Sequence, residues 1–323
     1  MIDLPLTFII PYKKDCDDRQ RNLSVVVRYL LHNYNSNVIV LEADQEKTID
    51  KILPEDDRLT CMFEYLPEGA VFHRTKYLNM MLDQVTTPLV ANYDVDVMFD
   101  PSTIDKACCL ILNNKADVVY PFGELKQDQL RLFLPSTFDE NYMINRKLYE
   151  HPRLLLDGMR EYFDGELPVV DNPHENLKNV QRNKNENPFF MSEHDYQPKC
   201  DFPNHGIGGW TTLAGHCIIF RTKTYFDGFM ENEEFIGWGP EDAERLKRFR
   251  MLGYNVVHLE GNLVFHLEHR NPLVSTEFNP NANKNELLWR NTFDPCNTQE
   301  EYEKIYSSYD YYNKYSHKEK ELA

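Results

Sequence analysis

The chain has 323 residues, 41% of them hydrophobic and 27% charged, which is typical of a globular protein with ample length for a buried core. Its formal charge of 35 − 52 = −17 argues against nucleic acid as a partner and gives no general attraction to anionic lipid. No apolar run approaches the roughly 20 residues of a membrane helix, and the N-terminus lacks the basic segment of a secretory signal, so we expect no transmembrane segment.

The first third of the chain alternates between strand-like and helix-like segments. Short apolar runs predict strands over residues 6–10, 38–41, 62–65, 89–91 and 118–120, with Pro11 ending the first of them. Helical spacing of apolar residues predicts helices over about residues 19–32, 73–85 and 101–113. This alternation predicts an open, mostly parallel sheet covered by helices.

Residues 123–205 interrupt the alternation with a polar stretch that has little to bury. We interpret them as an inserted, lid-like region rather than an independent domain. Beyond them, the pattern predicts strands over 215–220, 255–259 and 263–267, and helices over 222–228, 240–253 and 298–308. Leu246, Phe249 and Leu252 give the helix that follows Pro240 its apolar face.

Polar residues follow several predicted strands at the edge where parallel sheets bind ligands. Pro11-Tyr12-Lys13 follows the first strand, Glu42 ends the second, and Asp94 and Asp96 follow the run at 89–91. Alternation along an extended backbone would point Asp94 and Asp96 to the same side. Buried carboxylates need a partner, and their hard oxygens suit a divalent cation that carries phosphates. A solvated acidic turn is the alternative interpretation.

A second feature is the segment Gly237-Trp238-Gly239-Pro240-Glu241-Asp242, where a predicted helix begins. The two glycines let the backbone approach a ligand closely, and the tryptophan offers a flat apolar face of the kind that packs on sugars. The acidic pair could instead serve only the helix N-terminus, which is worth about 0.3–1 kcal/mol. That alternative explains the carboxylates but not a tryptophan between glycines.

A third feature is the pair His266 and His269, three residues apart at the end of the last predicted strand. A lone histidine at a strand end is usually a satisfied polar residue. Two of them could complete an octahedral metal site begun by Asp96, and imidazole favours Mn²⁺ over Mg²⁺ there.

Five motifs together resemble those of GT-A-fold glycosyltransferases in order and rough spacing: FHRTKYLN (72–79), YDVD (93–96), AGHCIIF (214–220), FIGWGPED (235–242) and FHLEHR (265–270). They are most similar to β-1,4-galactosyltransferases, bacterial chondroitin-type polymerases and predicted capsule-biosynthesis family 2 glycosyltransferases. The resemblance implies an α/β fold, a GT-A-type, Rossmann-like open mixed sheet flanked by helices, with a helical or irregular insertion. We accordingly expect four regions: a nucleotide-sugar-binding half (1–122), an acceptor or lid insertion (123–205), an acceptor and catalytic half of the same domain (206–272) and a C-terminal tail with a helix (273–323).

Carried over residue by residue, the resemblance implies a donor site. Pro11, Tyr12 and Lys13 match the segment that touches the nucleotide, and Glu42 matches a residue near the uracil. Arg74 matches the arginine that contacts the donor diphosphate, a role that suits the guanidinium fork, with a helix-surface ion pair as the alternative.

The resemblance also implies the metal ligands and the contact to the donor. Asp96 matches the aspartate that binds the metal directly, whereas Asp94 matches a contact to the donor ribose or sugar. His269 matches the family's histidine ligand. His266 stands where animal galactosyltransferases carry methionine, which implies a harder site made only of nitrogen and oxygen donors.

On the acceptor side, the resemblance assigns the catalytic base to Asp242. Glu241 matches a neighbour that bonds the acceptor, and Trp238 the aromatic residue that seats donor and acceptor sugars. Pro240 departs from the glycine usual in the family and stiffens the turn without removing a carboxylate.

These assignments predict a metal-dependent inverting transfer of a hexose or N-acetylhexosamine from a UDP-sugar to a glycan acceptor hydroxyl, with Asp242 as base and Mn²⁺ (or Mg²⁺) as cofactor. Three alternatives stay open: a retaining transferase, a nucleotidyltransferase and a non-catalytic sugar-nucleotide-binding module. The first is considered because polypeptide N-acetylgalactosaminyltransferases, which are retaining enzymes, share a looser version of the segment around Trp238. Seven cysteines without framework spacing indicate a reducing compartment, so we expect a cytoplasmic protein. The expected acceptor is a glycan or a lipid-linked sugar, reached from the membrane surface as a peripheral protein.

Overall fold

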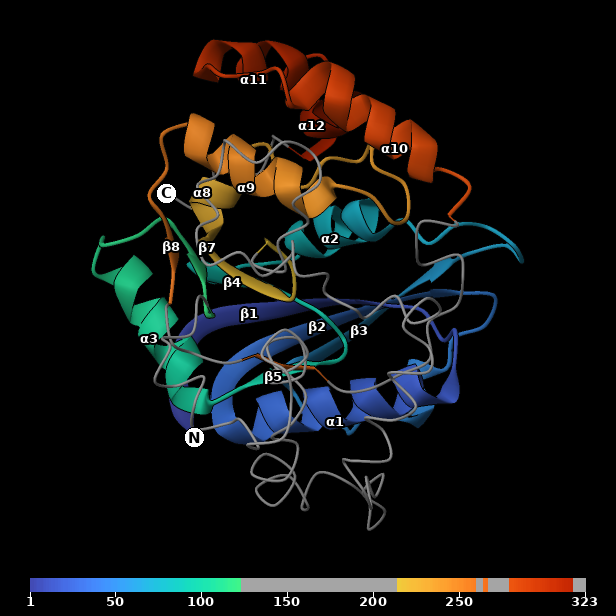
Figure 1. The fold of residues 1–323 in the computed structure, drawn as a ribbon. Coiled ribbons are helices and arrows are strands. Elements are labelled where there is room, and N and C mark those ends of the chain that lie inside the picture. The colour runs from blue at the N-terminus through green and yellow to red at the C-terminus, as the bar shows by residue number, and fades with distance from the viewer. Residues whose placement is uncertain (123–213, 260–263, 267–278, 316–323) are drawn as a thin grey trace, which may run out of the picture.

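The computed structural model describes residues 1–122, 214–259, 264–266 and 279–315. Strands in these residues form a seven-stranded sheet, in the order β3-β2-β1-β4-β7-β6-β8, and a separate ladder of β5 with β9 (Figure 1). The strands are β1 (Ile2–Tyr12), β2 (Tyr34–Asp44), β3 (Leu59–Tyr65), β4 (Leu89–Tyr93), β5 (Val97–Phe99), β6 (Val118–Tyr120), β7 (Cys217–Arg221), β8 (Val256–His258) and β9 (Val264–His266). The predicted class, an open mixed α/β sheet flanked by helices, is confirmed.

Helices cover both sides of this sheet. Figure 1 shows α1 on one side and α2, α8 and α9 on the other, with α10, α11 and α12 as an outer layer beyond α9. The helices are α1 (Asp17–Asn33), α2 (Arg74–Leu82), α3 (Pro101–Leu112), α8 (Thr222–Asp227), α9 (Glu241–Met251), α10 (Ala282–Leu288), α11 (Gln299–Tyr306) and α12 (Asp310–Tyr315). None of the described helices combines the length and apolar character that a membrane crossing requires.

Four neighbouring strands of the sheet, β3, β2, β1 and β4, are parallel, and β6 is parallel to β8. The prediction that Pro11 ends the first strand was wrong, because β1 continues to Tyr12, which pairs with Glu42 of β2. Pairing with β4 extends only as far as Ile9, so one missing N–H beyond that point is tolerated. The register therefore brings the segments that follow β1 and β2 to one edge of the sheet.

Strand β7 is antiparallel to both of its neighbours, which makes the mostly parallel sheet a mixed one, as the resemblance implied. An apolar run does not encode the direction of a strand, so the sequence pattern could not distinguish the two arrangements. In the observed register Tyr93 pairs with Cys217, and the Asp94 N–H donates to the His216 carbonyl oxygen at 2.9 Å. Residues just before β7 thus lie beside Asp94.

The two-stranded ladder of β5 with β9 begins immediately after Asp96, the second aspartate of the YDVD motif. In this antiparallel pair, Val97 of β5 lies opposite His266 of β9. Asp96 immediately precedes Val97, so the backbone of His266 lies next to that of Asp96 in spite of about 170 residues of intervening chain.

Helix α9 is buried on more than its predicted apolar face. Leu246 and Phe249 lie in the core as expected, but Arg248 is also fully buried. The Arg248 Nε donates to Glu244 Oε1 at 2.9 Å, and the Tyr306 hydroxyl donates to the same oxygen at 2.6 Å. The C-terminal helices therefore cover the polar side of α9 and supply partners for its charges.

The C-terminal tail is more helical than the single helix predicted over 298–308. That helix is present as α11, which begins with a capping box between Thr298 and Glu301. In addition, α10 leads into a π-helical turn over Trp289–Phe293, and α12 follows α11. Aromatic contacts hold two of these additions, because Tyr312 of α12 packs on Phe229 and Phe293 of the π-helical turn packs on Tyr306.

Candidate active site

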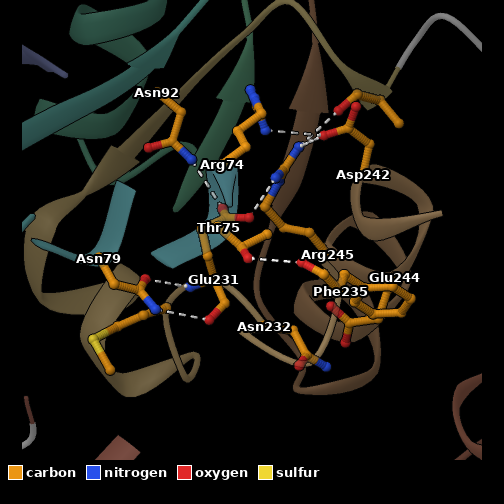
Figure 2. Close-up of polar contacts among 12 residues, drawn as sticks. Arg74, Thr75, Asn79, Asn92, Glu231, Asn232, Phe235, Asp242, Glu244 and Arg245 are labelled. Carbon is orange, nitrogen blue, oxygen red and sulfur yellow. Dashed lines mark hydrogen bonds and ion pairs between the residues drawn. The ribbon is translucent and has the colours of Figure 1, made fainter. Parts of the chain in front are cut away.

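Arg74 joins two carboxylates from distant parts of the chain. It is the first residue of α2, and its Nη2 lies 2.7 Å from Asp94 Oδ1, just after β4. Its Nη1 lies 3.7 Å from Asp242 Oδ1, near the start of α9 (Figure 2). Burial opposes the charged form, but Asp94 and Asp242 together raise the pKa of Arg74. The predicted donor contact and the predicted base are therefore brought together by one cation.

The start of α2 is fixed by the residue before it. The His73 ring accepts a hydrogen bond from the Lys76 N–H at 3.4 Å, in the manner of an N-cap. Burial, and secondarily Lys76, lowers the pKa of His73 to about 4, so the ring is neutral at pH 7 and its nitrogen can accept. The Thr75 hydroxyl also donates a hydrogen bond to the Phe235 carbonyl oxygen at 3.1 Å. This bond connects α2 to the segment that precedes the turn at residues 236–239, which contains Trp238 and is called the tryptophan turn below.

The two aspartates of the YDVD motif have different partners. Strand β4 ends at Tyr93 and residues 95–96 form a turn, so the prediction that strand alternation continues through both aspartates was wrong. Asp94 is paired with Arg74 of α2. Asp96 is 4% exposed, and its Oδ2 lies 3.5 Å from Arg19 Nη1 of α1. The two carboxylates are thus held by helices that Figure 1 shows on different sides of the sheet.

Asp242 lies in the first turn of α9, with its side chain 34% exposed. Arg245, one turn further along, also forms an ion pair with Asp242 Oδ1. A Cβ atom built on Gly215 would lie 3.0 Å from Asp242 Oδ2, so the carboxylate approaches the chain before β7 at a point where it has no side chain. Asp242 is therefore oriented by neighbours and still reachable from solvent.

Arg245 belongs to a buried polar network that sequence reasoning missed. Its Nη1 lies 2.7 Å from Glu231 Oε2, and both side chains are 1% exposed. Glu231 Oε1 in turn accepts hydrogen bonds from the Tyr225 hydroxyl at 2.6 Å and from the Asn92 amide at 2.9 Å. The three-residue spacing from Asp242 to Arg245 on a helix could have indicated their pairing. Nothing in the sequence pattern points to Glu231 as the second partner.

Glu241 is buried beside Asp242, and its Oε2 has no hydrogen-bond partner among the residues that the structure describes. Burial, followed by repulsion from Asp242, raises the pKa of Glu241 to about 8. The helix N-terminus favours an ionised carboxylate, but desolvation is the stronger effect here. At pH 7 Glu241 is therefore largely protonated and can donate a hydrogen bond.

The tryptophan turn is held from the tail. Gly237 has a φ of +74°, which favours glycine, and Trp238 is half-buried. The amide nitrogen of Asn285 donates to the carbonyl oxygens of Ile236 at 3.0 Å and of Trp238 at 2.8 Å. Asn279 donates to the same two oxygens at 3.0 and 3.1 Å. Sequence reasoning missed both asparagines, because the tail carries no motif of the resembled family.

The residues expected to contact the nucleotide lie at the same edge of the sheet. Pro11 and Tyr12 are buried, and Lys13 is partly exposed. Glu42 is fully buried, and its carboxylate accepts from the Thr48 N–H at 2.6 Å, the Thr48 hydroxyl at 2.5 Å and the Ile49 N–H at 3.0 Å. Glu42 therefore fixes the loop after β2, and its contact with uracil stays a prediction.

Within the described ranges, no group of three or more histidine, cysteine, aspartate or glutamate side chains is arranged to hold a metal ion. His269 and the predicted insertion over 123–205 lie outside those ranges. What the structure contributes is the ladder that aligns His266 with the residue after Asp96. This register brings the backbones of Asp96 and His266 close together, and carboxylate oxygen and imidazole nitrogen are donor types that Mn²⁺ accepts.

No family model and no curated protein matches the chain. Solved structures of similar fold include the mannosyltransferase PcManGT from Pyrobaculum calidifontis in complex with GDP-Man and Mn²⁺, at 12% identity and a TM-score of 0.43, covering 84% of this chain and 59% of that one. Glucosyl-3-phosphoglycerate synthase from Mycobacterium tuberculosis, with Mn²⁺, UDP and phosphoglyceric acid, has 12% identity and a TM-score of 0.41, covering 84% and 72%. Drosophila β1,4-galactosyltransferase 7 with xylobiose has 10% identity and a TM-score of 0.38, covering 84% and 72%.

The chain spans about three fifths of the length of the first solved structures that it matches. At such identities and TM-scores the likeness concerns the fold, so the function has to be argued from the residues of the site.

Proposed function

We propose that this chain is a metal-dependent, inverting glycosyltransferase that moves a hexose or N-acetylhexosamine from a UDP-sugar to an acceptor hydroxyl. The observation that carries the proposal is the position of Arg74, 2.7 Å from Asp94 and 3.7 Å from Asp242 at the carboxyl edge of the sheet. A guanidinium group there suits a diphosphate, and a partly exposed carboxylate beside it suits a proton acceptor.

On the donor side, Arg74 would contact the diphosphate and Asp94 the ribose or sugar. The two residues are already paired, so a diphosphate would compete with Asp94 for the same guanidinium group. Pro11, Tyr12 and Lys13 would line the nucleotide, with Lys13 as the partly exposed cation of that segment. Glu42 would act near the uracil mainly through the loop that it holds.

The metal site would consist of Asp96, His266 and His269. The ladder of β5 with β9 supports the first two, because it places His266 opposite the residue that follows Asp96. Asp96 is already paired with Arg19 at 3.5 Å, so a bound metal ion would compete with that guanidinium group for the carboxylate. A bound Mn²⁺ or Mg²⁺ would neutralise charge on the departing diphosphate.

On the acceptor side, Trp238 would provide the face on which sugars pack, and Glu241 would bond an acceptor hydroxyl. The raised pKa of Glu241, about 8, means that it would donate that hydrogen bond at neutral pH. Asp242 would act as the base. Its exposed edge and its orientation by Arg245 both support this role.

The reaction is a single displacement. The acceptor oxygen forms a bond to the anomeric carbon as the bond from that carbon to the diphosphate oxygen breaks. Asp242 takes the hydroxyl proton, and the electron pair of the broken bond leaves with the nucleoside diphosphate, whose charge Arg74 helps to stabilise. One carboxylate base suffices, whereas a double displacement through a covalent intermediate would need a second carboxylate as nucleophile.

The partners that fit this proposal are a UDP-sugar and a glycan or lipid-linked sugar. We propose that the chain acts in the cytoplasm, at the membrane surface when the acceptor is lipid-linked. Its charge of −17 argues against binding by general electrostatic attraction to anionic lipid, so the acceptor itself would bring the two together.

The test is a panel of UDP-glucose, UDP-galactose and their N-acetylated forms with Mn²⁺, scored by slow hydrolysis to free UDP, which needs no acceptor. We expect one or two of these donors to be cleaved. Asp242→Asn should lose nearly all transfer and still bind UDP, because the substitution removes the base and keeps the side-chain shape. If the wild type neither binds UDP nor cleaves any donor, the proposal is refuted. A product with retained anomeric configuration by NMR would refute the inverting mechanism alone.

A further inference from the structure

Asn279 and Asn285 lie in the C-terminal tail, in the part of the chain that the five motifs do not reach. Both are nearly or fully buried, at 4% and 0% exposure. Buried amides are expensive unless they are hydrogen-bonded, so their contacts identify what they hold. Both amide nitrogens donate to the same two acceptors, the carbonyl oxygens of Ile236 and Trp238.

The shape of the turn is matched to these two side chains. A Cβ atom on Gly237 would lie 2.5 Å from the amide nitrogen of Asn279, and one on Gly239 would lie 2.8 Å from that of Asn285. The glycines that flank Trp238 are therefore needed for the close approach of the asparagines. Asn285 also accepts a hydrogen bond from the Ile236 N–H at 3.3 Å, so it binds both polar groups of that residue.

The tryptophan turn is followed directly by the acidic residues at the start of α9. Trp238 is followed by Gly239 and Pro240, and α9 begins at Glu241 and Asp242. Because the carbonyl oxygens of Ile236 and Trp238 are fixed on either side of Gly237, both the orientation of Trp238 and the entry into α9 depend on the tail. Asn285 is itself fixed within α10, where its backbone N–H donates to the Asn281 carbonyl oxygen at 2.8 Å.

We infer that Asn279 and Asn285 are positioning residues for the acceptor side of the site, and that the C-terminal tail is a working part of that site. The inference rests on the proposed function for the identity of the ligand, a sugar acceptor packed on Trp238. Its structural half, the fixing of the tryptophan turn by the two amides, can be measured without any ligand.

The first experiment labels the full chain with 5-fluorotryptophan, which gives signals from Trp210, Trp238 and Trp289, and assigns that of Trp238 with Trp238→Phe. In Asn285→Asp an oxygen replaces the donating nitrogen, and in Asn279→Ala the donor is lost. We expect the Trp238 ¹⁹F signal to shift or broaden in both variants. Tyr306→Phe is the matched control, because it removes tail hydrogen bonds to Glu244 and Asn232 without touching the turn.

The second experiment measures kinetics with the UDP-sugar that the wild type cleaves and p-nitrophenyl β-glycosides as acceptor probes. The acceptor KM should rise at least about tenfold in Asn285→Asp and Asn279→Ala, the equivalent of one or two ordinary hydrogen bonds, and this loss should exceed any loss of acceptor-independent UDP release. Asn285→Gln, which keeps the amide, should recover part of the loss. A general loss of folding would lower both activities together.

The outcomes separate the inference from the proposed function. If the wild type cleaves no UDP-sugar, the proposed function fails, and the ¹⁹F signal alone decides whether the asparagines fix the turn. If donors are cleaved but the Trp238 signal and the acceptor KM change no more in the asparagine variants than in Tyr306→Phe, the positioning role is overturned. Equal losses of donor cleavage and transfer would also overturn it, because they would indicate a purely structural role.

Discussion

Arg245 offers the most direct test of how the site is built, because it is an arginine in the core with two carboxylate partners. Its side chain is 1% exposed, it lies 2.7 Å from Glu231 Oε2, and it also pairs with Asp242. In Arg245→Met the charge is lost while most of the side-chain volume remains. Glu231 is then left buried with only the neutral donors Tyr225 and Asn92.

The expected loss of stability is large. Removal of one partner from a buried ion pair costs about 3–5 kcal/mol, because the remaining charge is uncompensated. A folded domain of ordinary stability unfolds with about 5–15 kcal/mol, so Arg245→Met should consume a large part of that margin. Arg290→Met is the matched control: Arg290 is half-exposed and pairs with Glu286 at 2.6 Å on the surface, where such a pair contributes about 0–1 kcal/mol.

Urea denaturation followed by circular dichroism measures both effects. The double variant Glu231→Gln/Arg245→Met should recover part of the loss, because the buried charge is then removed as well. The reasoning is refuted if Arg245→Met is no less stable than Arg290→Met, or if the loss in the double variant equals the sum of the two single losses. Either result would mean that Arg245 and Glu231 do not depend on each other in the core.

Three further predictions concern the carboxylates and their surroundings. Because the pKa of Glu241 is raised from 4.5 to about 8, the folded state keeps a proton that the unfolded state has lost, so the free energy of unfolding should fall as pH rises from 4.5 to 8 and then level off. Urea titrations at several pH values should show a flatter dependence for Glu241→Gln, and the same dependence in this variant as in the wild type would contradict the prediction. Gly215→Ala places a methyl group 3.0 Å from Asp242 Oδ2 and should lower transfer by about tenfold to a hundredfold with little change in donor affinity, whereas undiminished transfer would mean that the carboxylate needs no fixed position. Asp96→Ala should abolish the response of UDP release to added Mn²⁺, and full activity of this variant in the presence of a chelator would remove the metal from the mechanism.

The fold was largely predictable from the sequence because its elements are marked by local chemistry. Buried strands such as β2 and β4 are short runs of apolar residues, and α1 and α3 carry apolar residues at helical spacing. The order of the strands was not predicted, because β4 follows β3 in the chain but lies beside β1. The direction of β7 was not predictable, since it depends on where the chain re-enters the sheet and not on the residues Cys217–Arg221 themselves.

In the candidate site, only residues that belong to a recognisable motif were named from the sequence. Arg74, Asp94 and Asp242 carry recognisable motifs, and the structure brings them within one cluster. Glu231 lies in an acidic run that would suit a solvated surface, and only the tertiary structure reveals that it is buried against Arg245. An ion-pair partner that is brought close by tertiary packing, and not by a fixed spacing along one helix, leaves no periodic signal in the sequence.

Arg74 shows why the two sequence segments with family motifs form one site. Asp94 comes from the segment over 1–122 and Asp242 from the segment over 206–272, and β4 and β7 of those segments are paired strands of one sheet. A single guanidinium group lies within 3.7 Å of both carboxylates, so a change in the charge beside Asp94 also changes the electrostatic surroundings of Asp242. If a diphosphate takes over Arg74, Asp242 loses one of the two cations beside it and keeps Arg245. Donor binding would then leave a carboxylate that is still oriented by Arg245, which is the geometry that a positioned base requires.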